Sequence, residues 1–204
     1  MYKIGITGSI GTGKTSIANI FALFKIPIFD ADKEIKKLLN EKKIKREIES
    51  IWPEAIKDNH VDKPKLKSII FSDIKEKKRL EGLLYPYLQT EKRSFEHANH
   101  NKLMVAYDVP LIYETKSNKN YNLILLTYCD PEIQRKRVLK RDKMTNFLYN
   151  KIISSQLSFE EKIKFNPKII NTNNSKAIIF IKMALLIART SIRLRIHKWK
   201  KRES

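Results

Sequence analysis

Cysteine is nearly absent from this chain of 204 residues. Cys129 is the only one, so no intrachain disulfide can form, and we expect a reducing, cytoplasmic setting. The N-terminus lacks the charged lead and long apolar segment of a secretory signal. The most apolar stretch, 177–188, is interrupted by Lys182 and falls short of the roughly 20 residues that a membrane-spanning helix needs. We therefore predict a buried helix there and no membrane partner.

Acidic residues are few relative to basic ones. The chain has 42 Lys and Arg against 22 Asp and Glu, which gives a formal net charge of +20. Such a charge would suit polyanionic partners, but no motif of an RNA- or DNA-binding module accompanies it, and the lysines are spread along the whole chain. We interpret the charge as solvated surface, expect no nucleic-acid partner, and predict that the basic tail 189–202 is a solvated helix end.

Glycine is scarce too, yet three of the 5 glycines lie between residues 8 and 13. The run from Gly8 to Thr15 fits the pattern Gly-x-x-x-x-Gly-Lys-Ser/Thr and follows the apolar segment 2–7, a predicted buried strand. Glycines let backbone amides approach phosphate oxygens, and a helix beginning at Lys14 directs the positive end of its dipole toward them. This pattern predicts a nucleotide-binding P-loop formed by Gly8, Gly11, Thr12, Gly13, Lys14, Thr15 and Ser16.

Within that P-loop, two side chains have predicted roles of their own. Lys14 is expected to reach the β and γ phosphates of the nucleotide. The Thr15 hydroxyl is expected to bind the Mg²⁺ that the nucleotide brings. The four histidines, in contrast, show no zinc-ligand spacing with Cys or Glu.

Apolar periodicity predicts strands that alternate with helices. Strands separated by helices give a parallel sheet, so the fold class is α/β, of the P-loop NTPase type, without an internal repeat or linker. A polar helical segment, 142–165, is predicted to form a lid. The predicted strands are 2–7, 26–29, 103–108, 123–128 and 168–170. The predicted helices are 15–24, 33–51, 65–84, 131–141 and 176–195. After 65–84, a further helix is predicted to restart at Tyr85-Pro86 and to run to residue 98.

Phosphoryl transfer requires charge neutralisation and a group that orients the attacking oxygen. Asp32 follows the second strand and could accept a hydrogen bond from a substrate hydroxyl; the alternative is that Asp32 or Asp30 caps the next helix. Asp108, at the end of the central strand, could support the coordination shell of the Mg²⁺ ion. Arg141 could contact phosphates from the lid, the alternative being a solvated surface arginine.

Five segments together resemble the dephospho-CoA kinase family. They are Ile6 to Thr15, Phe29-Asp30-Ala31-Asp32, the run Asp108-Val109-Pro110-Leu111-Ile112-Tyr113-Glu114, Arg141-Asp142, and Gln156. The resemblance covers residues 3 to about 189. It implies a kinase that uses ATP and Mg²⁺ to phosphorylate the ribose 3′-hydroxyl of dephospho-CoA, the last step of coenzyme A synthesis.

The same resemblance implies residue roles and regions. Asp32 would be the base, and Lys14, Thr15 and Arg141 would handle phosphates. A single domain, 1–204, would have its core at about 1–32, 101–141 and 166–204, a helical substrate region at about 33–100, and the lid. Tyr85 stands where the family usually has histidine, which predicts altered substrate affinity rather than lost chemistry.

Three other interpretations stay open at this stage. One is another small-molecule or nucleoside monophosphate kinase of the same fold, because the fold does not name the acceptor. The others are a nucleic-acid-stimulated NTPase and a non-catalytic homologue. The expected oligomeric state is a monomer or a weak homo-oligomer.

Overall fold

The computed structural model describes residues 1–141 and 144–203. The chain forms two compact units, Met1–Phe29 with Asn99–Ser204, and Asp30–Ala98. The first unit therefore consists of two segments of the chain, and the second unit is inserted between them. Each unit has a hydrophobic core of its own.

A five-stranded sheet organises the first unit, in the order β2-β5-β1-β6-β7. β1 runs parallel to both β5 and β6, and β6 runs parallel to β7. The α/β class and the five predicted strands are confirmed, with ends that differ by up to two residues. The strands are β1 (Tyr2–Thr7), β2 (Ile28–Asp30), β5 (Met104–Asp108), β6 (Leu123–Tyr128) and β7 (Lys168–Asn171).

The position of β1 in this sheet determines where a ligand can bind. The chain leaves β1 toward the β2 and β5 side, and it later adds β6 and β7 on the other side. The carboxyl end of β1 is therefore the point at which the strand order reverses, which is where open α/β sheets bind ligands. The P-loop follows β1 at this end.

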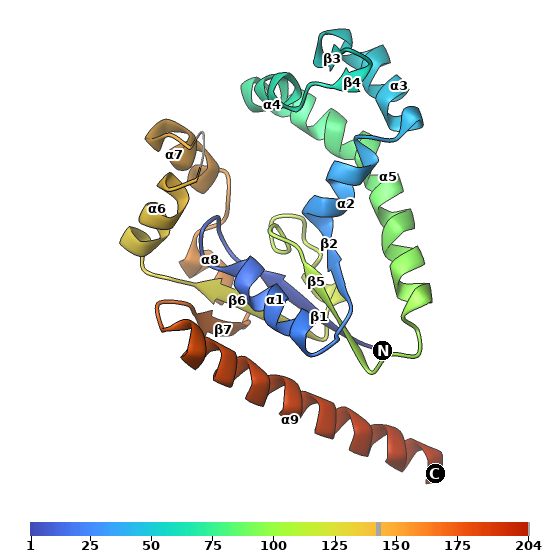
Figure 1. Ribbon diagram of the computed structural model, residues 1–204, viewed down its shortest axis with the longest axis vertical. Coiled ribbons are helices and arrows are strands. Elements are labelled where there is room, and N and C mark those ends of the chain that lie inside the picture. Colours follow the sequence, from blue (N-terminus) through green and yellow to red (C-terminus); the bar gives the residue numbers. More distant parts are fainter. Residues whose placement is uncertain (142–143, 204) are drawn as a thin grey trace. The chain divides into compact units, whose positions relative to one another are not determined.

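Two helices, α1 (Lys14–Leu23) and α9 (Lys176–Glu203), form one core with β1, β5 and β6. Phe21 of α1 and Met183 of α9 are fully buried in it. In Figure 1, α9 is the long red helix that ends at the C-terminus. No helix among residues 1–141 and 144–203 combines the length and the apolar character that a bilayer crossing requires.

Three shorter helices connect β6 to β7. They are α6 (Pro131–Leu139), α7 (Asn146–Ser154) and α8 (Phe159–Ile163). The predicted helical segment 142–165 is thus two helices, and its first two residues lie outside the described ranges. α8 begins at Ser158 because a capping box forms there: Ser158 and Glu161 each bond the backbone N–H of the other.

The second unit is helical and packs around Trp52 and Leu66, which are both 3% exposed. Its helices are α2 (Ala31–Leu38), α3 (Lys42–Ile51), α4 (Lys63–Ser72) and α5 (Ile74–Ala98), with a 3-10 turn at Pro53–Ala55. A small hairpin joins β3 (Ile56–Lys57) to β4 (His60–Val61). Neither strand of this hairpin is among those that the sequence analysis predicts. Asp58 and Asn59 make the turn possible because both adopt positive φ, at 49° and 60°.

Two helix predictions in this unit are wrong. The predicted helix 33–51 is interrupted between Leu38 and Lys42. The helix expected to restart at Pro86 is continuous through it, and the break lies instead at Asp73, whose carboxylate accepts the Lys75 N–H at 2.7 Å. A proline removes one helical hydrogen bond. Side chains before it (Leu80, Leu84) and after it (Tyr87, Leu88) pack into the same core, which offsets that loss.

We predict that the two faces of α9 respond differently to truncation. Met183→Ala should lower the free energy of unfolding by about 2–5 kcal/mol, because it leaves a cavity in the core. Leu185→Ala, at a side chain that is 52% exposed, should change it by less than about 0.5 kcal/mol. Urea unfolding of the two variants measures both values. Equal losses would contradict the assignment of Met183 to the core.

Candidate active site

The P-loop owes its shape to glycines in the left-handed region of backbone space. Gly13 has φ 94° and ψ 17°, and α1 begins at the next residue. A side chain in this conformation would cost roughly 1–2 kcal/mol. Gly8 has no room for one either, because a Cβ there would lie 2.7 Å from the carbonyl oxygen of Thr127.

The N-terminus of α1 supplies the anion-binding character. The first amides of an α-helix have no partner within the helix, and Gly13 has no side chain to cap them. These N–H groups and the helix dipole therefore favour an anion at this end. Thr15 and Ser16 lie exposed in the first turn, where a bound phosphate can reach them.

Lys14 lies along the inner side of the P-loop. Its Nζ donates to the carbonyl oxygen of Gly8 at 2.6 Å and to that of Ser9 at 3.1 Å. The ammonium group is thus held over the loop by carbonyls of the loop itself. A phosphate oxygen is a stronger acceptor for such a cation than a carbonyl oxygen is.

Side chains from three other segments hold Thr12 of the P-loop, two of them directly and one through Thr172. The Thr12 hydroxyl lies 2.7 Å from that of Thr127, on β6. The Thr172 hydroxyl donates to the Thr12 carbonyl at 2.9 Å. Arg137 of α6 in turn donates to the hydroxyl and the carbonyl oxygen of Thr172, at 3.0 and 2.9 Å. Nothing in the sequence pattern indicated this structural role of Arg137.

Two glutamines bind the tip of the loop at Ile10. Gln134 of α6 donates its amide to the Ile10 carbonyl at 2.7 Å. Gln156, which follows α7, accepts the Ile10 N–H at 3.3 Å. Both polar groups of one P-loop residue are therefore bonded to the segment that contains the helices α6 and α7. The resemblance singled out Gln156, but nothing in the sequence pattern indicated Gln134.

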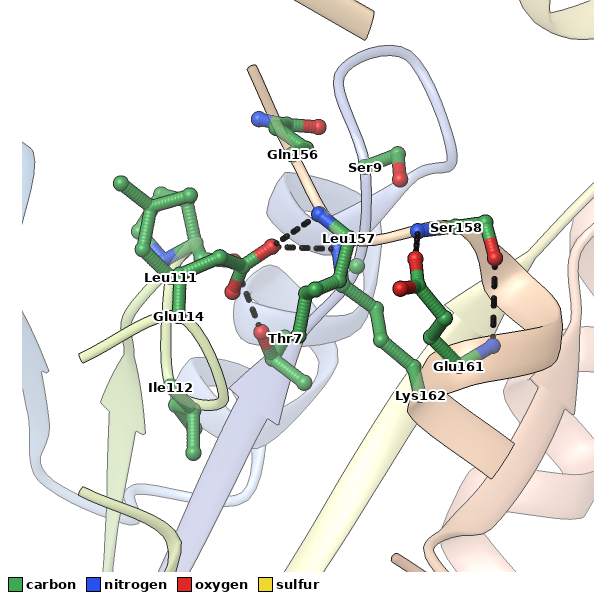
Figure 2. Close-up of polar contacts among 12 residues, drawn as sticks. Thr7, Ser9, Leu111, Ile112, Glu114, Gln156, Leu157, Ser158, Glu161 and Lys162 are labelled. Atoms are coloured by element: carbon green, nitrogen blue, oxygen red, sulfur yellow. Dashed lines mark hydrogen bonds and ion pairs between the residues drawn. The ribbon is translucent and has the colours of Figure 1, made fainter. Parts of the chain in front are cut away.

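A buried ion pair fixes the residues that follow Gln156. The Oε1 atom of Glu114 accepts the Leu157 N–H at 3.0 Å and lies 2.9 Å from the Nζ atom of Lys162, on α8. Lys162 is only 1% exposed and Glu114 is 15% exposed. Figure 2 shows both side chains pointing toward each other beside the end of β1, where Thr7 donates to the Pro110 carbonyl at 2.9 Å.

Two polar atoms of this ion pair lack hydrogen-bond partners among residues 1–141 and 144–203. Neither the Oε2 atom of Glu114 nor the Nζ atom of Lys162 has a hydrogen bond within that part of the chain. The contact with Lys162 is therefore an ion pair that lacks hydrogen-bond geometry. Each charge is compensated by its partner in a site from which water is largely excluded.

Asp108 and Thr15 lie at the same edge of the sheet. Asp108 ends β5 and is in register with Ile6 of β1, two residues before the P-loop. In the described part of the chain, no three His, Cys, Asp or Glu side chains gather to hold a metal. One hydroxyl and one carboxylate fit Mg²⁺ nonetheless, because that ion keeps several waters and is bound together with substrate phosphates.

Asp30 and Asp32 belong to the second unit and occupy different positions at the start of α2. Asp30 is the N-cap of α2 and accepts the Lys33 N–H at 3.0 Å. The capping alternative therefore applies to Asp30. Asp32 lies exposed in the first turn of the same helix, and its assignment as the base stays a proposal.

Two further residues from the sequence analysis lie at exposed positions. Arg141 follows the end of α6, and its side chain is exposed. Its predicted contact with phosphates stays a proposal. Tyr85, which replaces the usual histidine, is 62% exposed on α5, and its effect on affinity also stays a prediction.

Tyr113 lies next to the ion pair and is 3% exposed. Its ring stacks on Phe165, with 4.7 Å between the ring centroids. Its hydroxyl has no hydrogen bond within the described ranges. Burial, together with the neighbouring charge of Glu114, raises the pKa of Tyr113 to about 12.

We predict that breaking the ion pair is costly. Glu114→Ala leaves the Lys162 ammonium buried without its counter-ion, so the free energy of unfolding should fall by about 3–5 kcal/mol. Glu132→Ala makes the same charge change at an exposed site of α6 and should cost at most about 1 kcal/mol. The double variant Glu114→Gln with Lys162→Met should regain most of the loss. Equal unfolding free energies for the two alanine variants would show that the pair is not required.

We also predict a contribution of Tyr113 to the alkaline stability profile. Because its pKa is raised in the folded protein, its stabilisation is complete below the ordinary tyrosine value of about 10 and is lost as the pH rises toward about 12. Across this window wild type should lose up to about 2 kcal/mol that Tyr113→Phe does not lose. At neutral pH the variant should be at least as stable, since it removes a buried hydroxyl that lacks a partner.

Urea unfolding across this pH range compares the two proteins, with Tyr85→Phe as the exposed control. Parallel profiles for wild type and Tyr113→Phe would contradict the prediction.

Comparison with known proteins extends the evidence beyond geometry. The family model described as dephospho-CoA kinase matches residues 2–178. A dephospho-CoA kinase of Fusobacterium nucleatum is 33% identical over 182 residues, which cover 88% of this chain and 94% of that protein. One from Rhodopseudomonas palustris is 34% identical over 176 residues, which cover 85% of this chain and 88% of that protein.

Solved structures agree with this on the fold. A Thermus thermophilus protein superposes with a TM-score of 0.82 at 24% identity, covering 92% of this chain and 95% of that one. The dephospho-CoA kinase of Campylobacter jejuni gives a TM-score of 0.70 at 24% identity, covering 93% and 96%. The match of the family model over most of the chain, with relatives above 30% identity, shows that this chain belongs to the dephospho-CoA kinase family.

Proposed function

We propose that this protein transfers the γ-phosphoryl group of ATP to the ribose 3′-hydroxyl of dephospho-CoA, giving coenzyme A and ADP. The observation that carries the proposal is the P-loop, with Lys14 held over it, in a chain matched by the family over residues 2–178. The run from Asp108 to Glu114 resembles the dephospho-CoA kinase family. It therefore favours dephospho-CoA as the acceptor over the acceptor of another kinase with the same fold.

In the proposed reaction, the 3′-oxygen attacks the γ-phosphorus while the bond from that phosphorus to the β–γ bridging oxygen breaks. Asp32 accepts the proton of the hydroxyl, and ADP leaves. Lys14 and the amides at the start of α1 stabilise the charge that spreads over the phosphoryl oxygens. Arg141 contributes a second cation from the end of α6.

Mg²⁺ would be held by the Thr15 hydroxyl and supported by Asp108. When bound, it would neutralise charge on the β and γ phosphates. The inserted unit, 30–98, would contribute to binding of dephospho-CoA, and the segment around α7 would close over ATP. Gln156 and Gln134 connect that segment to Ile10, so the bound nucleotide and the segment can influence each other.

We further propose a cytoplasmic location and no nucleic-acid partner. The only thiol, Cys129, is 2% exposed, and burial raises its pKa, which makes it unreactive. A monomer, or at most a weak homo-oligomer, is enough for this mechanism, because every residue assigned a role belongs to one chain.

The direct test is ATP-dependent conversion of dephospho-CoA to coenzyme A in the presence of Mg²⁺, with the product identified by mass. AMP and a reaction without acceptor are the controls. Product from dephospho-CoA alone supports the proposal. Phosphorylation of AMP but not of dephospho-CoA would move the assignment to a nucleoside monophosphate kinase.

The role of Asp32 generates a prediction with a matched control. Asp32→Asn should lower kcat by about 10²–10⁴, the usual contribution of a general base, and leave the Kd for ATP nearly unchanged. Asp30→Asn makes the same chemical change two residues earlier, at a cap position where asparagine is as good as aspartate. It should retain turnover and stability. Wild-type kcat in Asp32→Asn would remove Asp32 from the mechanism.

A further inference from the structure

The C-terminal helix α9 has two apolar faces, and only one of them is buried. Ile179, Met183 and Ile187 lie in the core of the first unit. A second set of large apolar side chains, each between 44% and 60% exposed, lies on the outer side. We call this set the outer stripe: Ile178, Ile181, Leu185, Ile192, Ile196 and Trp199.

The spacing of the outer stripe makes it continuous. Ile178, Leu185, Ile192 and Trp199 follow one another at intervals of seven residues. Residues seven apart lie on the same side of an α-helix, since 3.6 residues make one turn. The stripe therefore runs along most of α9, and Figure 1 shows the C-terminal end of this helix extending away from the sheet.

Basic residues border the outer stripe on both sides. At 3.6 residues per turn, Lys182, Arg189, Arg193 and Lys200 line one border and Arg195 lies on the other, all of them exposed. From residue 162 to residue 202 the sequence contains no Asp or Glu. The surface of α9 is therefore apolar along its middle and cationic chiefly along one edge.

A partner for this surface must satisfy both properties. A second copy of the chain would cover the apolar stripe, but it would bring two rows of like charges together. A nucleic acid would meet the charge, but it would leave exposed isoleucines and Trp199 without an explanation. A bilayer with anionic headgroups accepts apolar side chains at the acyl boundary and attracts the flanking cations.

We propose that α9 lies flat on the surface of a bilayer that contains anionic phospholipids, with the outer stripe inserted and the flanking Lys and Arg at the headgroups. This binding surface is separate from phosphoryl transfer, since no residue assigned a role in that reaction lies on α9. The kinase would thereby be held at the cytoplasmic surface of a membrane without crossing the bilayer, and this proposal replaces the sequence-based expectation of no membrane partner.

The first test is co-sedimentation of the full chain with vesicles. The chain should sediment with vesicles of phosphatidylcholine mixed with phosphatidylglycerol, should remain in solution with phosphatidylcholine alone, and should be released by high salt. Binding that does not depend on phosphatidylglycerol, or no binding to either vesicle, would overturn the proposal.

Tryptophan fluorescence tests insertion separately from charge attraction. The chain has two tryptophans: Trp52 is 3% exposed in the second unit, and Trp199 is 60% exposed on the outer stripe. A shift of emission to shorter wavelength on anionic vesicles would therefore come from Trp199. It should disappear in Trp199→Phe, while sedimentation persists. Sedimentation of wild type without any shift would contradict insertion.

Variants of the outer stripe complete the test. Leu185→Asp combined with Ile192→Asp should weaken vesicle binding by at least about tenfold, because apolar insertion is lost and the charge falls by two. Leu23→Asp combined with Ile169→Asp makes the same charge change at exposed apolar side chains of α1 and β7 and should bind nearly as wild type does. Turnover of dephospho-CoA should be unchanged in both, so a failure of this proposal is distinguishable from a failure of the proposed function.

Two results would point to another partner. Self-association in the absence of lipid, abolished by the α9 double variant, would identify a second copy as the occupant of the stripe. Equal binding of an oligonucleotide by wild type and by the α9 double variant, with no vesicle binding by wild type, would show that only the charge of this surface acts. Either result would overturn the proposal.

Discussion

The rest of this structure depends on one constraint at the end of β1. A P-loop must leave amides available for phosphate, and every other polar group of its backbone must find a partner in the protein. Here the partners come from far along the chain: Thr172 donates to the Thr12 carbonyl, and two glutamines bond the N–H and the carbonyl of Ile10. These partners belong to the segment between β6 and β7 or directly follow β7, so this later part of the chain completes the P-loop.

The ion pair between Glu114 and Lys162 extends this arrangement away from the loop. It connects the segment that follows β5 to α8, and the same carboxylate accepts the amide of Leu157, directly after Gln156. Gln156 therefore reaches the P-loop from a backbone that is itself held. An ion pair suits this purpose because two buried charges tolerate little displacement from each other. Rigidity of this kind is what positioning of a phosphoryl group requires.

Much of the fold follows from local patterns. The strands 2–7 and 123–128 were predicted with the bounds that they have, because apolar runs closed by turn residues are local signals. The errors have two causes. Pro86 lies inside a helix because the leucines on both sides of it share one core, and such packing cannot be read from a window of neighbouring residues. The hairpin at 56–61 exists because Asp58 and Asn59 accept positive φ, a local turn signal that apolar periodicity does not contain.

The sequence by itself determined the P-loop, the parallel sheet and the family, because glycine spacing and strand-exit carboxylates are carried by consecutive residues. Only the tertiary structure decided which polar side chains surround Ile10, that Glu114 and Lys162 meet, and which face of α9 is buried. The two apolar faces of that helix are equally good candidates for the core as far as periodicity is concerned. Packing against α1 and the sheet buries Met183 and leaves Leu185 exposed, and that choice is made by contacts between residues that are far apart in the sequence.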